Sequence, residues 1–192
     1  MQIVFQDPFS SLDPRMKAKD VVAEPLRVVT KDRATIDSRV KQVFEEVGLG
    51  PGHLNHLPSQ FSGGQRQRIA AAQAIATKRK LVISDEPTST LDASTQAQIL
   101  NLLKTIRREE KMSFLFISHN VSVVRHMCQR IAVMYLGKIV EIGDAENILK
   151  HSKHPYTLTL VSSVPKPDPR ARAKLADVLG ETPRSSQSTE GL

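Results

Sequence analysis

Two short apolar runs of the sequence end in residues that could take part in phosphate chemistry. The run 81–84 leads into Asp85 and Glu86, and the run 114–117 is followed one residue later by His119. In a parallel α/β sheet, ligands bind beyond the carboxyl ends of the strands. A first carboxylate there can hold Mg²⁺, and a second can orient or polarise an attacking water molecule. Taken singly, the acidic pair also fits a polar exit turn, and a lone histidine more often caps a helix or lies in a core.

A third candidate is the segment 61–68, in which Ser62 is followed by Gly63, Gly64 and Gln65. The two glycines leave the backbone uncovered just before a helix. The unpaired N–H groups and the positive dipole end of that helix attract phosphate, and the Ser62 hydroxyl adds a donor. The alternative is a Gly-Gly turn in which Ser62 serves only as the helix N-cap.

The hydrophobic pattern predicts the elements that would position these residues. Short apolar strands alternating with helices predict an α/β fold, with a parallel sheet covered on both faces. We expect Pro25 to kink or end its helix early. Residues 48–60 are expected to form a loop. The expected strands are 2–5, 81–84, 114–118, 131–135 and 138–142, and the expected helices are 18–28, 32–47, 64–77, 94–110, 121–127, 145–150 and 155–162.

Composition narrows the class of protein. The 192 residues, 40% hydrophobic and 24% charged, are typical of one globular domain. The absence of Trp and the 4% aromatic content argue against base stacking on single-stranded nucleic acid. The single cysteine, Cys128, excludes an internal disulfide and a multi-cysteine zinc site. No membrane span or signal peptide is readable, so a cytosolic setting is expected.

The net charge of +7 is a weak indication of an anionic partner. The bases between residues 63 and 83 have no acid among them. They either bind an anion or form a solvated helix face.

Considered together, the motifs resemble the nucleotide-binding domain of ATP-binding cassette (ABC) transporters. The resemblance covers residues 1 to about 165 and rests on the order and spacing of five motifs. It implies a P-loop NTPase-like fold of the ABC type, in which a parallel sheet carries helices on both faces and a helical subdomain. By this resemblance, Gln6 is the Q-loop glutamine that reaches Mg²⁺ and the attacking water, Asp85 is the Walker B aspartate at Mg²⁺, and Glu86 is the catalytic glutamate. The signature loop, which contacts ATP held by the opposite subunit, consists of Ser62, Gly63, Gly64 and Gln65. Asp92 is the D-loop aspartate, and His119 is the switch histidine.

Finer similarity points to the oligopeptide and dipeptide importer ATPases. It is carried by the segments 4–16, 96–103, 135–143, 154–157 and 162–165, and the second-subunit type is the closer match. A sugar or nickel importer of the same subfamily would look much alike. The resemblance implies ATP and Mg²⁺ as ligands. It implies a second ATPase subunit and integral membrane permease subunits as partners, an extracytoplasmic peptide-binding protein indirectly, no nucleic acid, and a peripheral location at the cytoplasmic face of the membrane.

The P-loop pattern Gly-x-x-x-x-Gly-Lys-[Ser/Thr] does not occur in the sequence. In the family it precedes the Q-loop, so the chain resembles the carboxy-terminal half to two-thirds of such an ATPase. We expect a partial ABC domain over 1–165, consisting of a Q-loop and helical subdomain (about 1–78), a Walker B to switch region (about 79–143) and carboxy-terminal helices (144–164). A disordered tail is expected over 166–192.

Two further departures from the family pattern concern the helix after the signature loop and the carboxy-terminal end. The family's Ala-Arg-Ala is Ala72-Gln73-Ala74 here, which could weaken helix packing or a salt bridge. The carboxy-terminal cysteines that hold an iron–sulfur cluster in many peptide-importer ATPases are missing, so no such cluster is expected.

Two alternatives to a transport ATPase remain open. One is a nucleotide-incompetent remnant with a structural or regulatory role. The other is a soluble ABC ATPase that acts outside transport, although the tandem cassettes or long coiled-coil insertions usual in that class are absent. Because the P-loop supplies most phosphate-binding donors, we expect the chain alone to hydrolyse ATP poorly or not at all.

Overall fold

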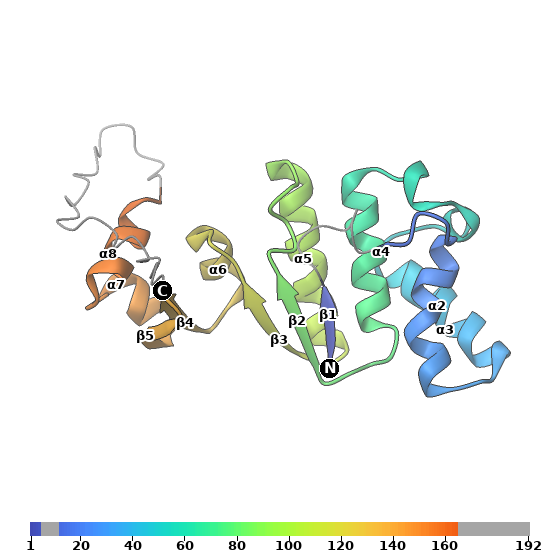
Figure 1. Ribbon diagram of the computed structural model, residues 1–192, viewed down its shortest axis with the longest axis horizontal. Coiled ribbons are helices and arrows are strands. Elements are labelled where there is room, and N and C mark those ends of the chain that lie inside the picture. Colours follow the sequence, from blue (N-terminus) through green and yellow to red (C-terminus); the bar gives the residue numbers. More distant parts are fainter. Residues whose placement is uncertain (5–11, 165–192) are drawn as a thin grey trace, which may run out of the picture. The chain divides into compact units, whose positions relative to one another are not determined.

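Figure 1 shows the chain as a computed structural model in which residues 1–4 and 12–164 are described. The chain groups into two compact units, Met1–Met127 and Cys128–Leu192, and each is considered by itself. The predicted Q-loop residue Gln6 and the predicted tail, 166–192, lie outside the described residues. The expected subdivision near residues 78 and 143 remains a prediction.

The first unit contains a three-stranded parallel sheet. Its strands lie side by side in the order β1-β2-β3 (Figure 1). Asp85 at the end of β2 pairs in register with Ile117 at the end of β3, so both strands end at the same edge. The predicted parallel arrangement is confirmed, and β2 and β3 match their expected bounds to within one residue. The strands are β1 (Gln2–Val4), β2 (Leu81–Asp85) and β3 (Ser113–Ile117).

Three helices accompany this sheet: α4 (Gly63–Ile75), α5 (Ala93–Glu109) and α6 (Val121–Met127). The first two begin at capping side chains. Ser62 accepts a hydrogen bond from the N–H of Gln65, and Asp92 accepts one from the N–H of Thr95. Such caps satisfy N–H groups that have no intrahelical acceptor, which fixes where each helix begins.

The sheet is covered on one face among the described residues. Val82 and Ser84 of β2 are fully buried. Side chains alternate between the two faces of a strand, and on the opposite face Ile3, Leu115 and Ile117 are 41%, 52% and 46% exposed. The expected cover on both faces is therefore seen on one face only. Of the accompanying helices, α4 packs beside β1, α5 packs on α4, and α6 is hydrogen-bonded to α5.

A layer of helices packs against α4. It comprises α2 (Ala18–Val29), α3 (Arg33–Glu46) and two short 3₁₀ helices, η1 (Pro51–Asn55) and η2 (Pro58–Gln60). The prediction that residues 48–60 form only a loop was wrong in part, because η1 and η2 lie there. Both 3₁₀ helices begin with a proline, whose fixed φ favours a helical first position.

The expectation that Pro25 ends its helix early was also wrong, because α2 continues to Val29. Proline removes one intrahelical hydrogen bond. Apolar burial on both sides of it offsets that loss: Val22 is fully buried and Leu26 is 7% exposed. A salt bridge of 2.7 Å between Asp20 and Arg27 also spans the proline.

Arg39 of α3 is the centre of a buried charge cluster and is only 8% exposed. Its guanidinium donates hydrogen bonds to the carbonyl oxygens of Ile75 and Ala76 at 3.1 Å each. It also forms salt bridges to Glu46 at 2.8 Å and to Glu110 at 3.4 Å. One side chain thus ties the carboxy-terminal end of α4 to α3 and to the end of α5.

Gln73 occupies the position where the family's arginine was expected. Its side-chain amide donates a hydrogen bond of 3.2 Å to the exposed carboxylate of Glu24, joining α4 to α2. Gln73→Arg is expected to turn this hydrogen bond into a salt bridge and to raise the free energy of unfolding by about 0.5 kcal/mol, as exposed pairs do. Urea denaturation would measure the change. The gain should vanish when Glu24→Gln is added, and a loss of stability on Gln73→Arg would contradict this account of the contact.

The second unit is an antiparallel hairpin followed by two short helices, at the positions where two strands and two helices were expected. Its elements are β4 (Arg130–Tyr135), β5 (Lys138–Asp144), α7 (Ala145–Lys150) and α8 (Pro155–Ser162). Gly137 turns the hairpin with a φ of +76°, which a glycine adopts without strain. The rings of Tyr135 and Tyr156 have centroids 4.5 Å apart, so α8 packs on the hairpin. Among the helices of the described residues, none is both long and apolar enough to cross a lipid bilayer.

Candidate functional site

Glu86 and His119 meet at the carboxyl edge of the parallel sheet. Nδ1 of His119 lies 2.7 Å from Oε1 of Glu86. The Glu86 side chain is 20% exposed and that of His119 is 74% exposed. A mostly sheltered carboxylate thus carries an imidazole that reaches solvent. This pairing can hold a proton or a water molecule at the sheet edge.

The backbone fixes Glu86 in an uncommon conformation. Its φ is +43°, in the left-handed region that costs a non-glycine residue roughly 1 kcal/mol. Its N–H donates to the carbonyl oxygen of Ile117 at 2.9 Å, which ties it to the end of β3. Its own carbonyl accepts hydrogen bonds from the N–H and the hydroxyl of Ser89, each 3.2 Å. Strained backbone of this kind concentrates at functional sites.

Asp85 lies immediately before Glu86, as the last residue of β2, and is half-buried. Mg²⁺ is commonly held by one or two carboxylates together with substrate phosphates and water. A single carboxylate at this edge fits that ligand set. The described residues contain no larger cluster of His, Cys, Asp and Glu that could hold a metal ion by itself. The other residue predicted at Mg²⁺, Gln6, is outside the described residues.

The loop at the start of α4 forms a capping box. The Gln65 N–H donates to Oγ of Ser62 at 3.3 Å, and the Ser62 N–H donates to Oε1 of Gln65 at 3.0 Å. Ser62 is therefore an N-cap, as the alternative interpretation of this segment had it. The cap does not use the N–H groups of Gly63 and Gly64, which have no intrahelical acceptor at this end of a helix. These amides keep the anion-attracting geometry that the sequence predicted.

Close packing against α5 accounts for the second glycine. A Cβ placed on Gly64 would overlap the Cγ2 methyl of Thr95, whereas one placed on Gly63 would lie 3.5 Å from Leu91, an ordinary contact. A side chain at position 64 would therefore push α4 and α5 apart. This contact also brings the loop 62–65 beside the start of α5.

Asp92 is the N-cap of α5. Its carboxylate accepts a hydrogen bond of 2.9 Å from the Thr95 N–H. That amide, with a further hydrogen bond from the Thr95 hydroxyl, holds the pKa of Asp92 below its ordinary value. The carboxylate is thus kept ionised at the helix N-terminus, where a negative charge is favoured. Its family role at the D-loop stays a prediction.

The structure gathers the predicted site residues into two groups within the first unit. Asp85, Glu86 and His119 lie at the sheet edge, and Asp92 lies beside the loop 62–65. Sequence reasoning missed Thr95, which contacts both Asp92 and Gly64. Its position three residues after a candidate N-cap was the available signal, because that position donates to the cap.

Comparisons with protein families match two separate parts of the chain. The family described as "ABC transporter" matches residues 1–89, and "Oligopeptide/dipeptide transporter, C-terminal region" matches residues 140–191. The dipeptide transport ATP-binding protein DppF of Lactococcus lactis subsp. cremoris (strain MG1363) is 49% identical over 170 residues, which are 88% of this chain and 54% of that protein. The oligopeptide transport ATP-binding protein OppF of Streptococcus mutans serotype c (strain ATCC 700610 / UA159) is 48% identical over 170 residues, 88% of this chain and 55% of that protein.

A solved structure supports the fold. It is the dimeric structure of a post-hydrolysis state of the ATP-binding cassette MJ0796 bound to ADP and Pi, and it is 29% identical. It matches 74% of this chain and 62% of that chain with a TM-score of 0.64. The chain spans about half the length of the curated relatives it matches. The chain therefore carries sequence of the ABC transporter family over residues 1–89 and of the C-terminal region of oligopeptide/dipeptide transporters over residues 140–191, on a P-loop NTPase-like fold.

Proposed function

We propose that this chain is part of an ATP-binding and ATP-hydrolysing subunit that powers the import of oligopeptides or dipeptides across the cytoplasmic membrane. The observation that carries the proposal is the 2.7 Å contact between Glu86 and His119 at the carboxyl edge of a parallel sheet. That edge is where α/β proteins bind ligands. The substrate class is supported by the names of the relatives, which are dipeptide and oligopeptide transport ATP-binding proteins.

The residues at the sheet edge suit phosphoryl transfer to water. Mg²⁺ held by Asp85 would neutralise the charge on the phosphates of ATP. Glu86 accepts a hydrogen bond from the attacking water and orients it. His119 fixes the Glu86 carboxylate and extends into solvent, where a transferred phosphate would lie. Gln6 is proposed to contact the same water and the metal, as its family position implies.

The start of α4 suits a different part of the nucleotide. The free amides of Gly63 and Gly64, at the positive end of a helix, can donate to a γ-phosphate. Ser62 and Gln65 shape this loop through their capping box, and Asp92 lies beside it. We propose that the loop closes on ATP held by a second ATPase subunit. A dimeric relative bound to ADP and Pi supports this arrangement.

The remaining partners follow from the transport role. They are integral membrane permease subunits and, through them, an extracytoplasmic peptide-binding protein. The ATPase would lie at the cytoplasmic face of the membrane as a peripheral subunit.

A second candidate is a protein without nucleotide turnover that serves a structural or regulatory role. One observation favours it. One face of the sheet leaves Ile3, Leu115 and Ile117 exposed, as expected of a surface that associates with another polypeptide.

A fusion with the amino-terminal part of a relative separates the two candidates. The 192-residue chain would be compared with a fusion in which the amino-terminal part of the Lactococcus lactis relative precedes residue 1. We expect the fusion to bind ATP and release phosphate. We expect the chain alone to do so at least about 100-fold more slowly, because the P-loop cradle supplies the positioning on which phosphoryl transfer depends. Binding of a fluorescent ATP analogue and a phosphate-release assay would measure both.

A fusion that folds and binds ATP but releases no phosphate would contradict the proposal and favour the non-catalytic candidate. Robust Mg²⁺-dependent turnover by the chain alone, abolished by Glu86→Gln, would agree with the proposal but would show that the P-loop segment is not required.

A further inference from the structure

A hollow of about 370 Å³ lies on the surface of α5, in the carboxy-terminal half of that helix. Among the described residues its lining consists of Lys104, Thr105, Arg107 and Arg108, so three of the lining side chains are cations and none is an acid. Lys104 and Arg108 are one helical turn apart, about 6 Å along the axis, and lie on the same face of the helix. The hollow thus concentrates positive charge.

The neighbouring helix α6 contributes a further nitrogen and fixes part of the lining. Nε2 of His126 lies 3.3 Å from Nζ of Lys104 and 3.4 Å from Oδ1 of Asn101. The ring nitrogen accepts from the lysine in one tautomer and donates to the asparagine in the other. Nη1 of Arg107 donates to the carbonyl oxygen of Met127 at 3.0 Å. These contacts hold two of the cations beside the hollow.

The acids nearest in the sequence do not neutralise these cations. Glu110 is paired with two cations of other elements, at 3.4 and 3.3 Å. Glu109 is exposed and does not line the hollow. Within the described part of the chain, Lys104 and Arg108 take part in no salt bridge. Positive charge that is gathered in one place without a counter-charge attracts anions.

The helix dipole explains only part of this arrangement. Arg107 and Arg108 lie in the last turn of α5, where the exposed carbonyl groups favour a cation. Lys104 lies more than a turn before the end of the helix at Glu109, and the dipole effect falls off within the last turn. The dipole also gives no reason for the cations to share one hollow. An anion that accepts from Lys104 and Arg108 together accounts for both features.

The bases between residues 63 and 83, a candidate anion site by sequence, have other roles. Arg66 and Arg68 donate hydrogen bonds to backbone carbonyl oxygens at 3.4 and 2.6 Å, and Lys78 forms a salt bridge of 3.3 Å with Glu110. Three of the five bases in this segment are therefore engaged within the fold. The hollow on α5 is the better place for the anionic partner that the net charge of +7 indicates.

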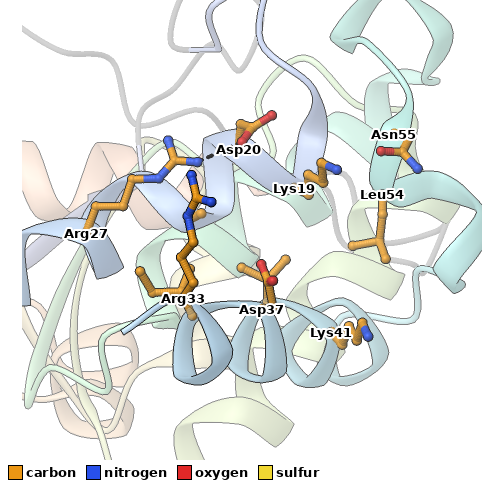
Figure 2. Close-up of a pocket in the computed structure, with 11 residues that line it drawn as sticks. Lys19, Asp20, Arg27, Arg33, Asp37, Lys41, Leu54 and Asn55 are labelled. Carbon is orange, nitrogen blue, oxygen red and sulfur yellow. Dashed lines mark hydrogen bonds and ion pairs between the residues drawn. The ribbon is translucent and has the colours of Figure 1, made fainter. Parts of the chain in front are cut away.

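A second hollow, between α2 and α3, is less suited to an anion (Figure 2). Its charged lining residues are Lys19, Asp20, Arg27, Arg33, Asp37 and Lys41. Asp20 pairs with Arg27 at 2.7 Å, and Figure 2 shows Asp37 between Arg33 and Lys41. Its own acids neutralise part of the positive charge and would repel an oxyanion. The two hollows therefore differ in the acids that they contain.

We propose that the hollow on α5 binds a phosphate-bearing anion. The ammonium group of Lys104 and the guanidinium of Arg108 donate charge-assisted hydrogen bonds to the phosphate oxygens, and the hydroxyl of Thr105 donates a further one. A free di- or triphosphate and a lipid phosphate headgroup share this chemistry. The inference does not rest on the proposed ATPase activity, since no residue that lines the hollow is assigned to the nucleotide.

The test uses the 192-residue chain and pyrophosphate, with binding followed by calorimetry and by the methyl NMR signal of Thr105. We expect a Kd below about 1 mM and a shift of this methyl signal. Lys104→Gln combined with Arg108→Gln should weaken binding by at least about fivefold, because two charge-assisted hydrogen bonds are lost. The affinity should also fall as salt is raised.

A second methyl signal separates this site from the proposed nucleotide loop. The Thr95 methyl lies against Gly64 and reports on the loop 62–65. A shift at Thr95 without one at Thr105 would place the anion at that loop and would overturn the proposal.

Vesicles of phosphatidylcholine mixed with phosphatidic acid distinguish the two sources of the phosphate. If the parent chain sediments with them, and the Lys104/Arg108 variant does not, the anion is a lipid headgroup. If the parent chain stays in solution while pyrophosphate shifts the Thr105 methyl signal, the anion is a free phosphate compound.

The matched control is Lys19→Gln with Lys41→Gln in the α2–α3 hollow, which lowers the net charge by the same amount. It should leave the affinity for pyrophosphate within about twofold. The proposal is overturned if the Lys104/Arg108 variant binds as well as the parent chain, or if the control loses as much affinity as that variant. It is also overturned if neither pyrophosphate at about 1 mM nor the vesicles bind.

Discussion

Glu86→Gln, placed in a chain extended to the length of its relatives, is expected to slow ATP turnover by about 100-fold or more. Glutamine keeps the size of the side chain and can still contact Nδ1 of His119, which now lies 2.7 Å from the carboxylate. It cannot act as a base toward water. ATP binding should persist, because neither residue is assigned to holding the phosphates. The effect should therefore appear in kcat, measured by phosphate release, with the affinity for ATP preserved.

The matched control is Glu109→Gln, which neutralises an exposed carboxylate on α5 and should leave turnover unchanged. His119→Ala should resemble Glu86→Gln, because it removes the group that fixes the carboxylate. If Glu86→Gln retains more than a tenth of parent turnover, Glu86 is not the residue that activates water. If both variants also lose ATP binding, the pair has a structural role at the sheet edge.

The convergence of Asp85, Glu86 and His119 could be predicted because parallel strands end at one edge of a sheet. In the sequence, these residues lie within two positions of the ends of two apolar runs, and the register of Asp85 with Ile117 brings the ends of the two strands together. The left-handed backbone of Glu86 could not be predicted. Nothing in its residue type favours a φ of +43°, and the conformation arises from its hydrogen bond to β3.

The fold was predictable where local signals and packing agree. The pattern of strands and helices in both units follows apolar periodicity and capping residues, so element bounds were close to those expected. Pro25 shows where local reasoning fails, because the burial of Val22 and Leu26 of the same helix offsets one lost hydrogen bond. The cover on one face of the sheet also could not be predicted, since the strands are apolar on both sides.

Arg39 was missed for a related reason. An arginine in an amphipathic helix usually lies on the solvated face, and its neighbours in the sequence are mixed in character. The available signal was its spacing: it lies three residues after Ile36 and four before Val43, both of which are buried. A cation on the buried face of a helix requires partners, but only the fold shows that they are Glu46, Glu110 and the end of α4.

Arg39→Met is expected to lower the free energy of unfolding by about 3 kcal/mol, the size typical of breaking a buried ion pair by removing one partner. Methionine fills a similar volume, so the loss arises from charge and hydrogen bonding. Glu46 and Glu110, whose side chains are 21% and 16% exposed, would lose their shared cation. At the end of α4, the carbonyl oxygen of Ala76 would lose its Arg39 donor, whereas that of Ile75 would keep the N–H of Lys78 at 3.0 Å. For a chain of this size the melting temperature should fall by roughly 6–12 °C, measured by circular dichroism.

Two companion variants separate charge from packing. Arg125→Met removes an exposed cation and should change the free energy of unfolding by less than about 0.5 kcal/mol. Adding Glu46→Gln to Arg39→Met should restore part of the lost stability, because Arg39→Met leaves Glu46 without its cation whereas Glu110 keeps a 3.3 Å salt bridge to Lys78. If this double variant is less stable than Arg39→Met alone, the Glu46 carboxylate is not the source of the penalty. The lost donors to Ile75 and Ala76 would then account for it, and Arg39 would act mainly as a cap on the carboxy-terminal end of α4.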